Sequence, residues 1–434
     1  MRRILTLLLF FLWLVPAMLV TGVRAASGEV YILRVSGTIV PVIADYIDRG
    51  IDRAESQQAA AVIIVLDTPG GLLDSTKKIV ERIIDSRVPV VTYVSHWAGS
   101  AGTFITMASH VAAIAPVSRI GAASPVAIGP SGEQQISPTM ERKITEDTAA
   151  WIRGIAKLRG RDEEKAELAV REGKSYDVDE AIQYRLVDFR ADSLDEVISL
   201  INGREVTLGS GEKVTINTAG KLPKEIGQSQ LEQFLHTISN PNIAYVLLTL
   251  AMIGLIAEFS NPGMIFPGVA GGISLLLAFY ALGVLDAYWG GLLLIMLAFG
   301  LFIAELFVIS QGILAAGGIA SFVTGSLLLF SGRSPMFQVN PWLVALTASL
   351  VAAFFIFVIS AVVRAHYRPA VTGREGLMGQ KARVVTRLAP EGTVMVEGEL
   401  WTATAEDGIV DPGQWVEVIQ TEGLRLKVRK AQST

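Results

Sequence analysis

The chain has 434 residues, and its hydrophobic fraction of 51% and mean hydropathy of +0.47 exclude an ordinary soluble protein. The net charge is only −4 and no block of like charge occurs, so no nucleic-acid-binding surface is expected. The absence of cysteine excludes disulfides and thiolate catalysis. The four histidines lack metal-ligand spacing, so we expect neither a metal nor a cofactor.

The N-terminus has the pattern of a secretory signal peptide, which we assign to residues 1–25. Two arginines precede an apolar run from Ile4 to Val20, and Val23 and Ala25 offer small residues for cleavage. An uncleaved N-terminal anchor is the alternative. In both cases the domain that follows is expected to be exported.

Residues 27–200 alternate short apolar runs with amphipathic stretches. Strands are expected at 30–35, 61–66 and 88–94, with helices at 72–84, 101–109 and over much of 140–190. This alternation predicts an α/β domain with mainly parallel strands. In residues 201–240 we expect a β-hairpin near 203–217, followed by an amphipathic stretch at 228–238 that leads to the membrane.

Residues 241–365 form a predicted multi-span α-helical membrane domain. About five apolar runs of spanning length occur, near 243–259, 265–285, 289–309, 312–331 and 341–363. The first run is short and the second begins with glycine and proline, so one of the two is a candidate for a re-entrant segment.

A weak internal repeat lies within this region. Leu255-Ile-Ala-Glu258 recurs 46–47 residues later as Phe302-Ile-Ala-Glu305, and each copy is followed by a pair of glycines. The repeat predicts a duplicated helical hairpin. The two glutamates could mark a function, since carboxylates are costly in a membrane, or could simply lie near helix ends.

Basic side chains follow the last apolar run, at Arg364, Arg368 and Arg374, which places that end of the chain in the cytoplasm. An exported domain before the spans then requires an odd number of crossings, which five satisfies. Residues 376–430 contain five short alternating strands separated by turns. They predict a small all-β barrel of the OB or SH3-like kind.

Ser100 is the strongest candidate for a catalytic residue. It lies between small residues where a predicted strand gives way to a helix, and a second turn, Asp67-Thr-Pro-Gly-Gly71, ends another strand. A serine at such a turn could act as a nucleophile, and amides of the glycine turn could bind an oxyanion. An ordinary glycine turn and a serine N-cap are the alternative.

The base for this serine is harder to identify. Only His110 and His236 lie between Ser100 and the membrane, and neither is well placed, so a Ser-His-Asp triad is not favoured. A Ser–Lys dyad instead needs a lysine kept neutral by burial. Spacing alone does not choose among the lysines of the domain, which include Lys77, Lys78, Lys143, Lys157 and Lys165.

Three motifs together resemble the NfeD family in its long form, a membrane-bound serine protease of the Clp-protease class. They are Asp67-Thr-Pro-Gly-Gly71, Ser100-Ala-Gly-Thr-Phe-Ile105 and Ile120-Gly-Ala-Ala-Ser-Pro125. The pattern from Gly379 to Ala403 is similar to the C-terminal module of that family, so the resemblance covers nearly the whole chain. The family usually has alanine before the serine, whereas Gly99 stands here.

The resemblance implies a Clp/crotonase-like spiral fold for the α/β domain, with Ser100 as nucleophile and Lys143 as base. It implies an oxyanion hole formed by backbone amides of Gly70 or Gly71 and of Ala101. The Clp protease itself uses a histidine about 25 residues after its serine. The corresponding segment around Ser124 has none, so the dyad fits.

The predicted function is that of a membrane-anchored, ATP-independent serine endopeptidase that cleaves hydrophobic segments of stomatin-like (SPFH) membrane proteins. The protease domain is expected outside the cytoplasm and the barrel inside, where it could contact such a partner. A homo-oligomer, either a dimer or larger, and contact with membrane lipid are also expected. The alternatives are a non-proteolytic membrane scaffold or regulator of SPFH assemblies and, less favoured for an exported domain, a crotonase-like acyl-CoA enzyme.

Overall fold

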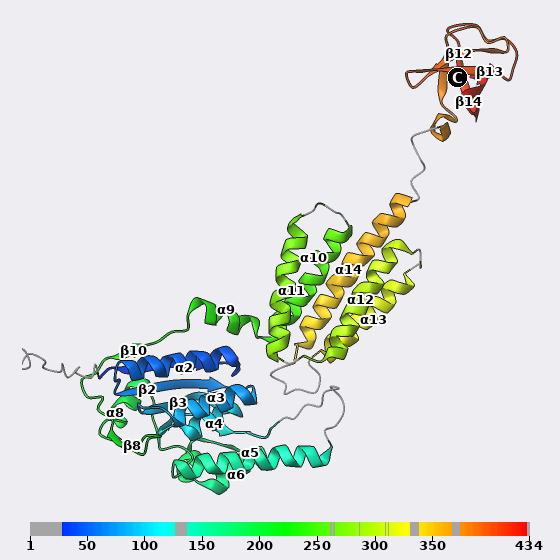
Figure 1. The fold of residues 1–434 in the computed structure, drawn as a ribbon. Helices are drawn as coiled ribbons and strands as arrows, with labels where there is room; N and C mark the ends of the chain where they lie inside the picture. Colours follow the sequence, from blue (N-terminus) through cyan, green and yellow to red (C-terminus); the bar gives the residue numbers. More distant parts are fainter. Residues whose placement is uncertain are drawn as a thin grey trace, which may run out of the picture. The chain divides into compact units, whose positions relative to one another are not determined.

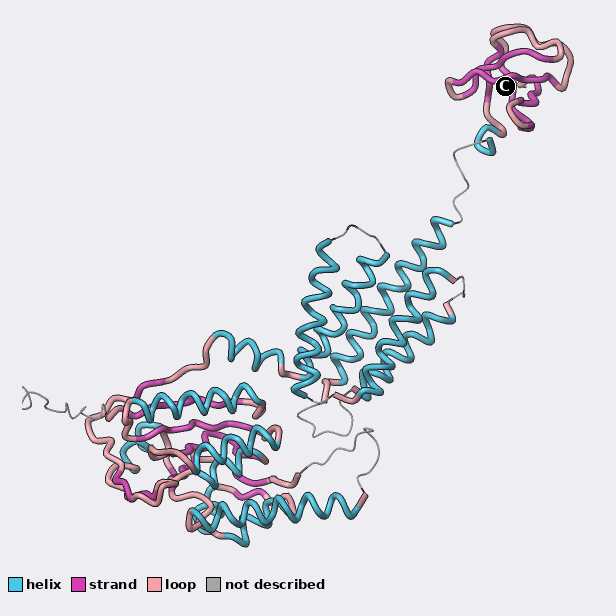
Figure 2. The backbone as a smooth tube through the Cα atoms, viewed as in Figure 1, coloured by secondary structure: helices cyan, strands magenta, loops and turns pink. Residues whose placement is uncertain are grey.

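The computed structural model describes residues 28–125, 137–260, 263, 265–285, 287–308, 310, 312–329, 338–366 and 374–431. The signal peptide predicted at residues 1–25 lies outside the described residues. Tertiary contacts divide the chain into two units, Met1–Ala352 and Ala353–Thr434, and each is described by itself. Figure 2 distinguishes an α/β domain, a group of helices and an all-β domain.

The α/β domain is built on a sheet with the strand order β10-β1-β2-β3-β4-β7 (Figure 1). All neighbours along this order are parallel. The strands are β1 (Val30–Ser36), β2 (Ala61–Thr68), β3 (Val90–Gly99), β4 (Val111–Ile114), β7 (Phe189–Arg190) and β10 (Pro223–Glu225). The central strands are continuous apolar runs because side chains on both faces of the sheet are buried.

Two further strands extend the end of β3. Strand β5 (Arg119–Gly121) runs parallel to it, and β6 (Ser175–Tyr176) pairs antiparallel with β5. The helices of the domain are α2 (Pro41–Ser56), α3 (Leu73–Ile84), α4 (Ala101–Ala108), α5 (Pro138–Leu158), α6 (Glu163–Arg171), α7 (Val178–Gln183), α8 (Leu194–Leu200) and α9 (Gln230–Ile238). The predicted hairpin is confirmed as β8 (Glu205–Thr207) and β9 (Lys213–Thr215).

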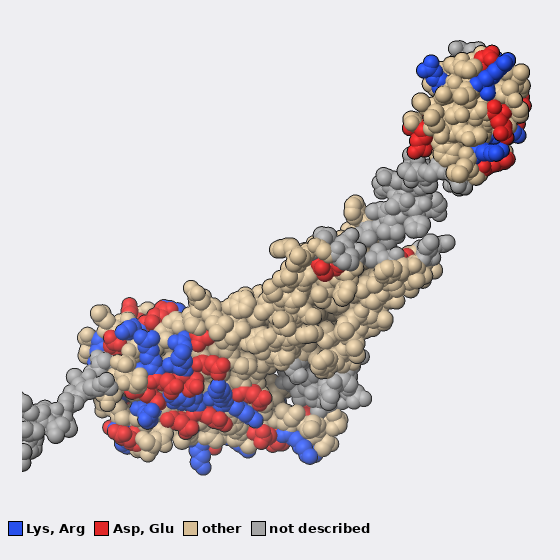
Figure 3. All heavy atoms as spheres, turned by 45° about the horizontal axis from the view of Figure 1, so that its top comes forward, with Lys and Arg blue, Asp and Glu red and all other residues tan. Residues whose placement is uncertain are grey.

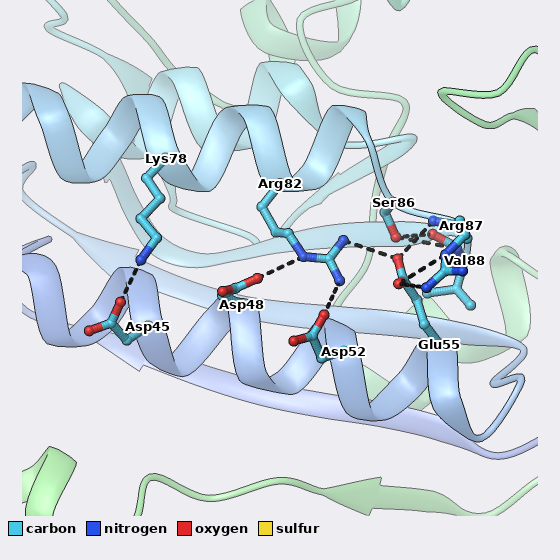
Figure 4. Close-up of polar contacts among 9 residues, drawn as sticks. All are labelled: Asp45, Asp48, Asp52, Glu55, Lys78, Arg82, Ser86, Arg87 and Val88. Carbon is cyan, nitrogen blue, oxygen red and sulfur yellow. Dashed lines mark hydrogen bonds and ion pairs between the residues drawn. The ribbon is translucent and has the colours of Figure 1, made fainter.

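A row of ion pairs joins α2 to α3 (Figure 4). Acidic side chains recur every three or four residues on one face of α2, at Asp45, Asp48, Asp52 and Glu55. On α3, Lys78 lies 2.6 Å from the first of these, and Arg82 contacts the other three at 2.7 to 3.0 Å. The exposed Lys78 pair contributes little, about 0–1 kcal/mol. The side chains of Arg82 and Glu55 are mostly buried, so removal of either partner would leave a buried charge unpaired between the two helices.

Five apolar helices follow in the described part of the chain: α10 (Pro241–Ser260), α11 (Ile265–Leu285), α12 (Trp289–Phe307), α13 (Ile313–Leu328) and α14 (Pro341–His366). Two stretches, Pro241–Phe259 and Ile265–Leu285, are long and apolar enough to cross a membrane, with mean hydropathies of 1.9 and 2.0. The other three helices contain shorter apolar stretches. Charged side chains cover the α/β domain and the barrel but are nearly absent from the surface of these helices that Figure 3 shows. That all five helices cross the membrane stays a prediction.

The internal repeat corresponds to two similar hairpins, α10–α11 and α12–α13. At a constant offset of 47 residues, Gly271 approaches the backbone of Leu255 and Gly318 approaches the ring of Phe302. A Cβ added to either glycine would lie 2.9 Å from Leu255 N or 2.5 Å from Phe302 Cε1, so both positions need glycine for close helix packing.

The two membrane glutamates occupy equivalent places in these hairpins. Glu305 accepts hydrogen bonds from the amides of Gly312 and Ala315 at 3.0 and 3.1 Å and therefore caps the start of α13. Glu258 lies against Gly268, the residue equivalent to Ala315. The capping role of Glu305 supports the interpretation that this glutamate lies near a helix end and stabilises it, rather than marking a function.

The C-terminal unit contains the predicted OB-like barrel. Its strands are β11 (Lys381–Val384), β12 (Glu391–Val396), β13 (Glu399–Ala405), β14 (Trp415–Glu422) and β15 (Arg425–Lys430), preceded by the short helix η3 (Arg374–Leu377). They close in the order β11-β12-β13-β15-β14. Alternate side chains fill the interior, among them Val384, Val394 and Val416, as the period of two in the sequence predicts.

Candidate active site

Ser100 occupies the tight turn between β3 and α4, at the N-cap position of the helix. Its backbone has φ +46° and ψ −109°, a conformation that costs a residue other than glycine about 1–3 kcal/mol. The Ser100 amide donates to Gly121 O at 3.0 Å, and the Thr103 amide donates to Ser100 O at 2.9 Å. The residue is half-buried, and its hydroxyl forms no hydrogen bond to any residue that the structure describes. The fold thus holds a strained serine with an available hydroxyl.

The small residues beside Ser100 allow its turn to approach the turn after β2. A Cβ on Gly102 would lie 2.7 Å from Thr68 Cγ2. A Cβ on Gly99 would lie 2.6 Å from Trp97 Cε2 and 2.8 Å from Pro69 O. The glycine that replaces the usual alanine before the serine is therefore required by the neighbouring tryptophan and by the glycine turn.

The glycine turn offers one available amide rather than two. The Gly70 amide donates to Thr68 Oγ1 at 3.0 Å, so it is already occupied. The amides of Gly71 and Ala101 donate no hydrogen bond within the described residues, and Ala101 is the first residue of α4, where helix amides are free. A Cβ on Gly71 would lie 2.2 Å from Ile39 O, so this position also requires glycine.

The structure does not bring Lys143 to Ser100. Lys143 lies in the first turns of α5, which extend beyond the rest of the domain in Figure 1, and the buried residues of that helix begin only at Thr148. Its side chain is exposed and, among the described residues, has no hydrogen bond or ion pair. A dyad needs a desolvated amine, and this lysine is solvated in the single chain.

Helices α4 and α5 nevertheless run in the same direction. The rings of Phe104 and Trp151 stack with centroids 4.5 Å apart, and further along both helices Arg159 Nε donates to Ala108 O at 2.7 Å. Ser100 comes four residues before Phe104, and Lys143 comes eight residues before Trp151. Both residues therefore lie toward the same end of the helix pair.

Arg161, which the sequence did not single out, fixes the opposite end of the pair. Its buried guanidinium donates to Met107 O at 3.3 Å, to Ser109 O at 3.2 Å and to Leu186 O at 2.8 Å. It also pairs with Asp188 at 3.2 Å. A cation at these carbonyls is favourable because they carry the negative end of the helix dipole.

The two downstream histidines do not contact Ser100. His110 is buried, its Nδ1 accepts from the Val90 amide at 3.1 Å, and burial lowers its pKa to about 3. Burial likewise lowers the pKa of His236, which lies beside Gly37.

One histidine upstream of the serine does lie near the site. His96 Nδ1 is 3.4 Å from Asp67 Oδ2, and both side chains are exposed at the ends of β3 and β2. The sequence could have suggested this pair, because Asp67 opens the glycine turn and His96 precedes Ser100 by four residues. His96 is therefore the competing base that an experiment must exclude.

Three family models match successive parts of the chain. They describe the N-terminal domain of NfeD1b over residues 29–197, the NfeD integral membrane domain over 242–361, and an NfeD-like C-terminal, partner-binding domain over 374–430. The matches follow the three structural domains in order.

Two curated proteins are similar over nearly their full length. The membrane-bound protease PH1510 of Pyrococcus horikoshii is 35% identical, covering 99% of this chain and 98% of its own. The membrane protein NfeD1b of Bacillus subtilis is 27% identical and covers 94% of each chain. Among solved structures, a lysine-to-alanine mutant of the 1510-N membrane-bound stomatin-specific protease, in complex with a substrate peptide, is 32% identical. It covers 49% of this chain and 97% of its own, with a TM-score of 0.44.

Proposed function

Because the chain belongs to the NfeD family, in the long form that joins a ClpP-like serine protease domain to a membrane domain and a barrel, we propose that Ser100 and Lys143 form its catalytic dyad. The observation that carries this proposal is the strained turn at Ser100, whose flanking glycines, Gly99 and Gly102, pack against the turn that contains Gly71. An available hydroxyl at a turn with available backbone amides nearby is the arrangement that acyl transfer requires.

In the proposed reaction, Ser100 Oγ attacks the carbonyl carbon of the scissile peptide bond while the neutral amine of Lys143 takes the hydroxyl proton. The amides of Gly71 and Ala101 stabilise the oxyanion of the tetrahedral intermediate. Lys143 then gives its proton to the leaving amine, and water hydrolyses the acyl-enzyme. Because Thr68 occupies the Gly70 amide, Gly71 is the donor that we assign to the glycine turn.

The parallel course of α4 and α5 supports Lys143 as the base. Counted from the stacked pair Phe104 and Trp151, Ser100 lies about 6 Å and Lys143 about 12 Å along the two helices in the same direction. No comparable argument favours Lys157, which is exposed near the opposite end of α5. Substrate bound between the two helix ends would bury the amine and favour its neutral form.

We propose that the substrates are apolar segments of stomatin-like membrane proteins. The relative of known structure is named a stomatin-specific protease, which supports this class.

We further propose that the protease domain and the barrel lie on opposite sides of the membrane. Asn340 N donates to Asn242 Oδ1 at 2.8 Å, so α10 and α14 begin at the same end of the helices. The α/β domain precedes the start of α10, and the barrel follows the end of α14. Basic residues near and beyond the end of α14, such as Arg364 and Arg368, support a cytoplasmic barrel and a protease domain outside.

The test is cleavage of an apolar peptide by the purified full-length protein in detergent. Ser100→Ala and Lys143→Ala should each abolish cleavage, while Lys157→Ala, a matched exposed lysine on the same helix, should cleave at the wild-type rate. His96→Ala should also remain active. Full activity of Lys143→Ala together with loss of activity in His96→Ala would replace the dyad with a Ser–His arrangement.

A further inference from the structure

We propose that a row of residues on the outer surface of the C-terminal barrel, formed by Trp415, Arg383, Met395 and Leu400, is the docking surface for an apolar, carboxylate-bearing segment of a stomatin-type protein. This inference rests on the proposed function for the class of partner. The docking row itself is deduced from strand register, exposure and charge.

The four residues are direct neighbours across four strands. Trp415 on β14 is paired with Arg383 on β11, Arg383 with Met395 on β12, and Met395 with Leu400 on β13. Side chains paired across strands lie on the same face of the sheet. The row therefore crosses four of the five strands of the barrel.

The apolar members of the row are exposed although the barrel has a well-filled interior. Trp415, Met395 and Leu400 are 55%, 42% and 62% exposed, and Val385, which directly follows the end of β11, is also exposed. Contiguous exposed apolar side chains on a small domain mark an interaction surface. The second and third strands of an OB-like barrel, here β12 and β13, form its usual binding face.

The charge at the centre of the row defines the chemistry of the partner. Arg383 forms no hydrogen bond or ion pair with another described residue, whereas the other three arginines of residues 376–430 do, namely Arg387, Arg425 and Arg429. An arginine flanked by apolar side chains can pair with a carboxylate that arrives with its own apolar neighbours. We therefore expect an acidic residue within an apolar segment of the partner.

Other classes of ligand fit the barrel less well. Residues 374–431 contain eight basic and nine acidic residues, so the domain has no net positive charge that would attract nucleic acid or an anionic membrane. The row is bordered on one side by Lys381, Glu417 and Glu397, which form a polar rim. An apolar centre with a polar rim is typical of protein interfaces. The family model that matches this domain describes it as partner-binding.

The test measures binding of the full-length protein in nanodiscs to a stomatin-type protein of the same organism. Trp415→Ala, Leu400→Ser and Arg383→Glu should each weaken binding about tenfold or more. The matched control is Leu424→Ser, because Leu424 is 75% exposed in the turn between β14 and β15 and lies outside the row. Hydrogen exchange of the barrel amides verifies that each variant is folded.

A photocrosslinking residue at position 395 identifies what covers the row. Crosslinks to the stomatin-type protein support the proposal, whereas crosslinks only to lipid or to a second copy of this chain would overturn it. Unchanged affinity in all three folded row variants, or no binding by the wild type, would also overturn it. Peptide cleavage is measured on the same samples. Intact cleavage without docking refutes only the docking row, and docking without cleavage refutes only the proposed function.

Discussion

The two ends of the α4–α5 helix pair differ in how completely they are held. At one end the buried guanidinium of Arg161 bonds to three carbonyls and a carboxylate, and Arg159 bonds to a fourth carbonyl. At the other end Ser100 is held in a strained turn, but Lys143 is exposed and makes no such contact with the described residues. The fold therefore holds the proposed nucleophile in a fixed turn, whereas the proposed base must be brought to it.

This difference has a physical reason. A serine hydroxyl is neutral, so its presence at a half-buried turn carries no charge-desolvation cost. A lysine amine that is buried without a partner must lose its charge, which costs free energy until substrate supplies the surrounding contacts. An enzyme that desolvates its lysine only with substrate bound avoids that cost in the free state.

Arg161→Met tests the well-held end and should have the largest effect. Removal of the guanidinium leaves three carbonyls and Asp188 without their donor, which should lower the free energy of unfolding by about 3–5 kcal/mol. Denaturant unfolding of the full-length protein in detergent measures the loss. Because Arg161 lies far from Ser100, the remaining folded protein should still cleave peptide. Wild-type stability in this variant would show that the hydrogen bonds of Arg161 do not stabilise the end of α4.

Gly71→Ala tests the other end. The added Cβ would lie 2.2 Å from Ile39 O and must displace the amide that we assign to the oxyanion hole. We expect kcat to fall about 10²- to 10³-fold, the usual cost of losing one oxyanion donor. Steady-state kinetics with the apolar peptide give the value. A change in KM alone, with kcat retained, would remove Gly71 from the oxyanion hole.

The pH dependence of stability should report on His110, which lies at the well-held end. Its pKa is about 3 in the folded protein and near 6.5 when unfolded, so the unfolded chain binds more protons as the pH falls. The contribution of neutral His110 to the free energy of unfolding should therefore be fully present above about pH 6.5. The free energy of unfolding should fall by about 2 kcal/mol by pH 5. His110→Gln keeps an acceptor for the Val90 amide and should flatten this slope. Equal slopes in the two proteins would contradict the burial of a neutral imidazole.

Much of the fold follows directly from the sequence. The continuous apolar runs of β2 and β3 predicted buried parallel strands, because side chains on both faces of such strands are buried. The alternating C-terminal runs predicted the barrel, because only every second side chain of its strands is buried. Helix α2 was not among the expected elements. It begins at Pro41 immediately after a strand, and its apolar face is interrupted by the acidic residues that pair with α3.

The candidate site likewise has features that the sequence predicts and features that it does not. The turns that hold Ser100, Gly71 and Ala101 could be predicted because each is formed by a few consecutive residues, while the catalytic roles of these residues stay predictions. Three features of the site could not be predicted from the sequence, because they depend on how the chain folds around them. They are the hydrogen bond from the Gly70 amide to Thr68, the hydrogen bonds of Arg161 to carbonyls, and the exposure of Lys143. The identity of the base for Ser100 is therefore the feature of the site to measure first.

The most direct measurement uses the absence of cysteine from the chain. In Lys143→Cys the single thiol can be alkylated to an aminoethyl thioether, which restores a lysine-like amine that is slightly more acidic. We predict that the Lys143→Cys protein is inactive, that aminoethylation restores peptide cleavage, and that the acidic limb of kcat/KM against pH moves to lower pH than in the wild type. Activity in the unmodified Lys143→Cys protein, or a restored protein whose pH profile does not move, would show that Lys143 is not the base for Ser100.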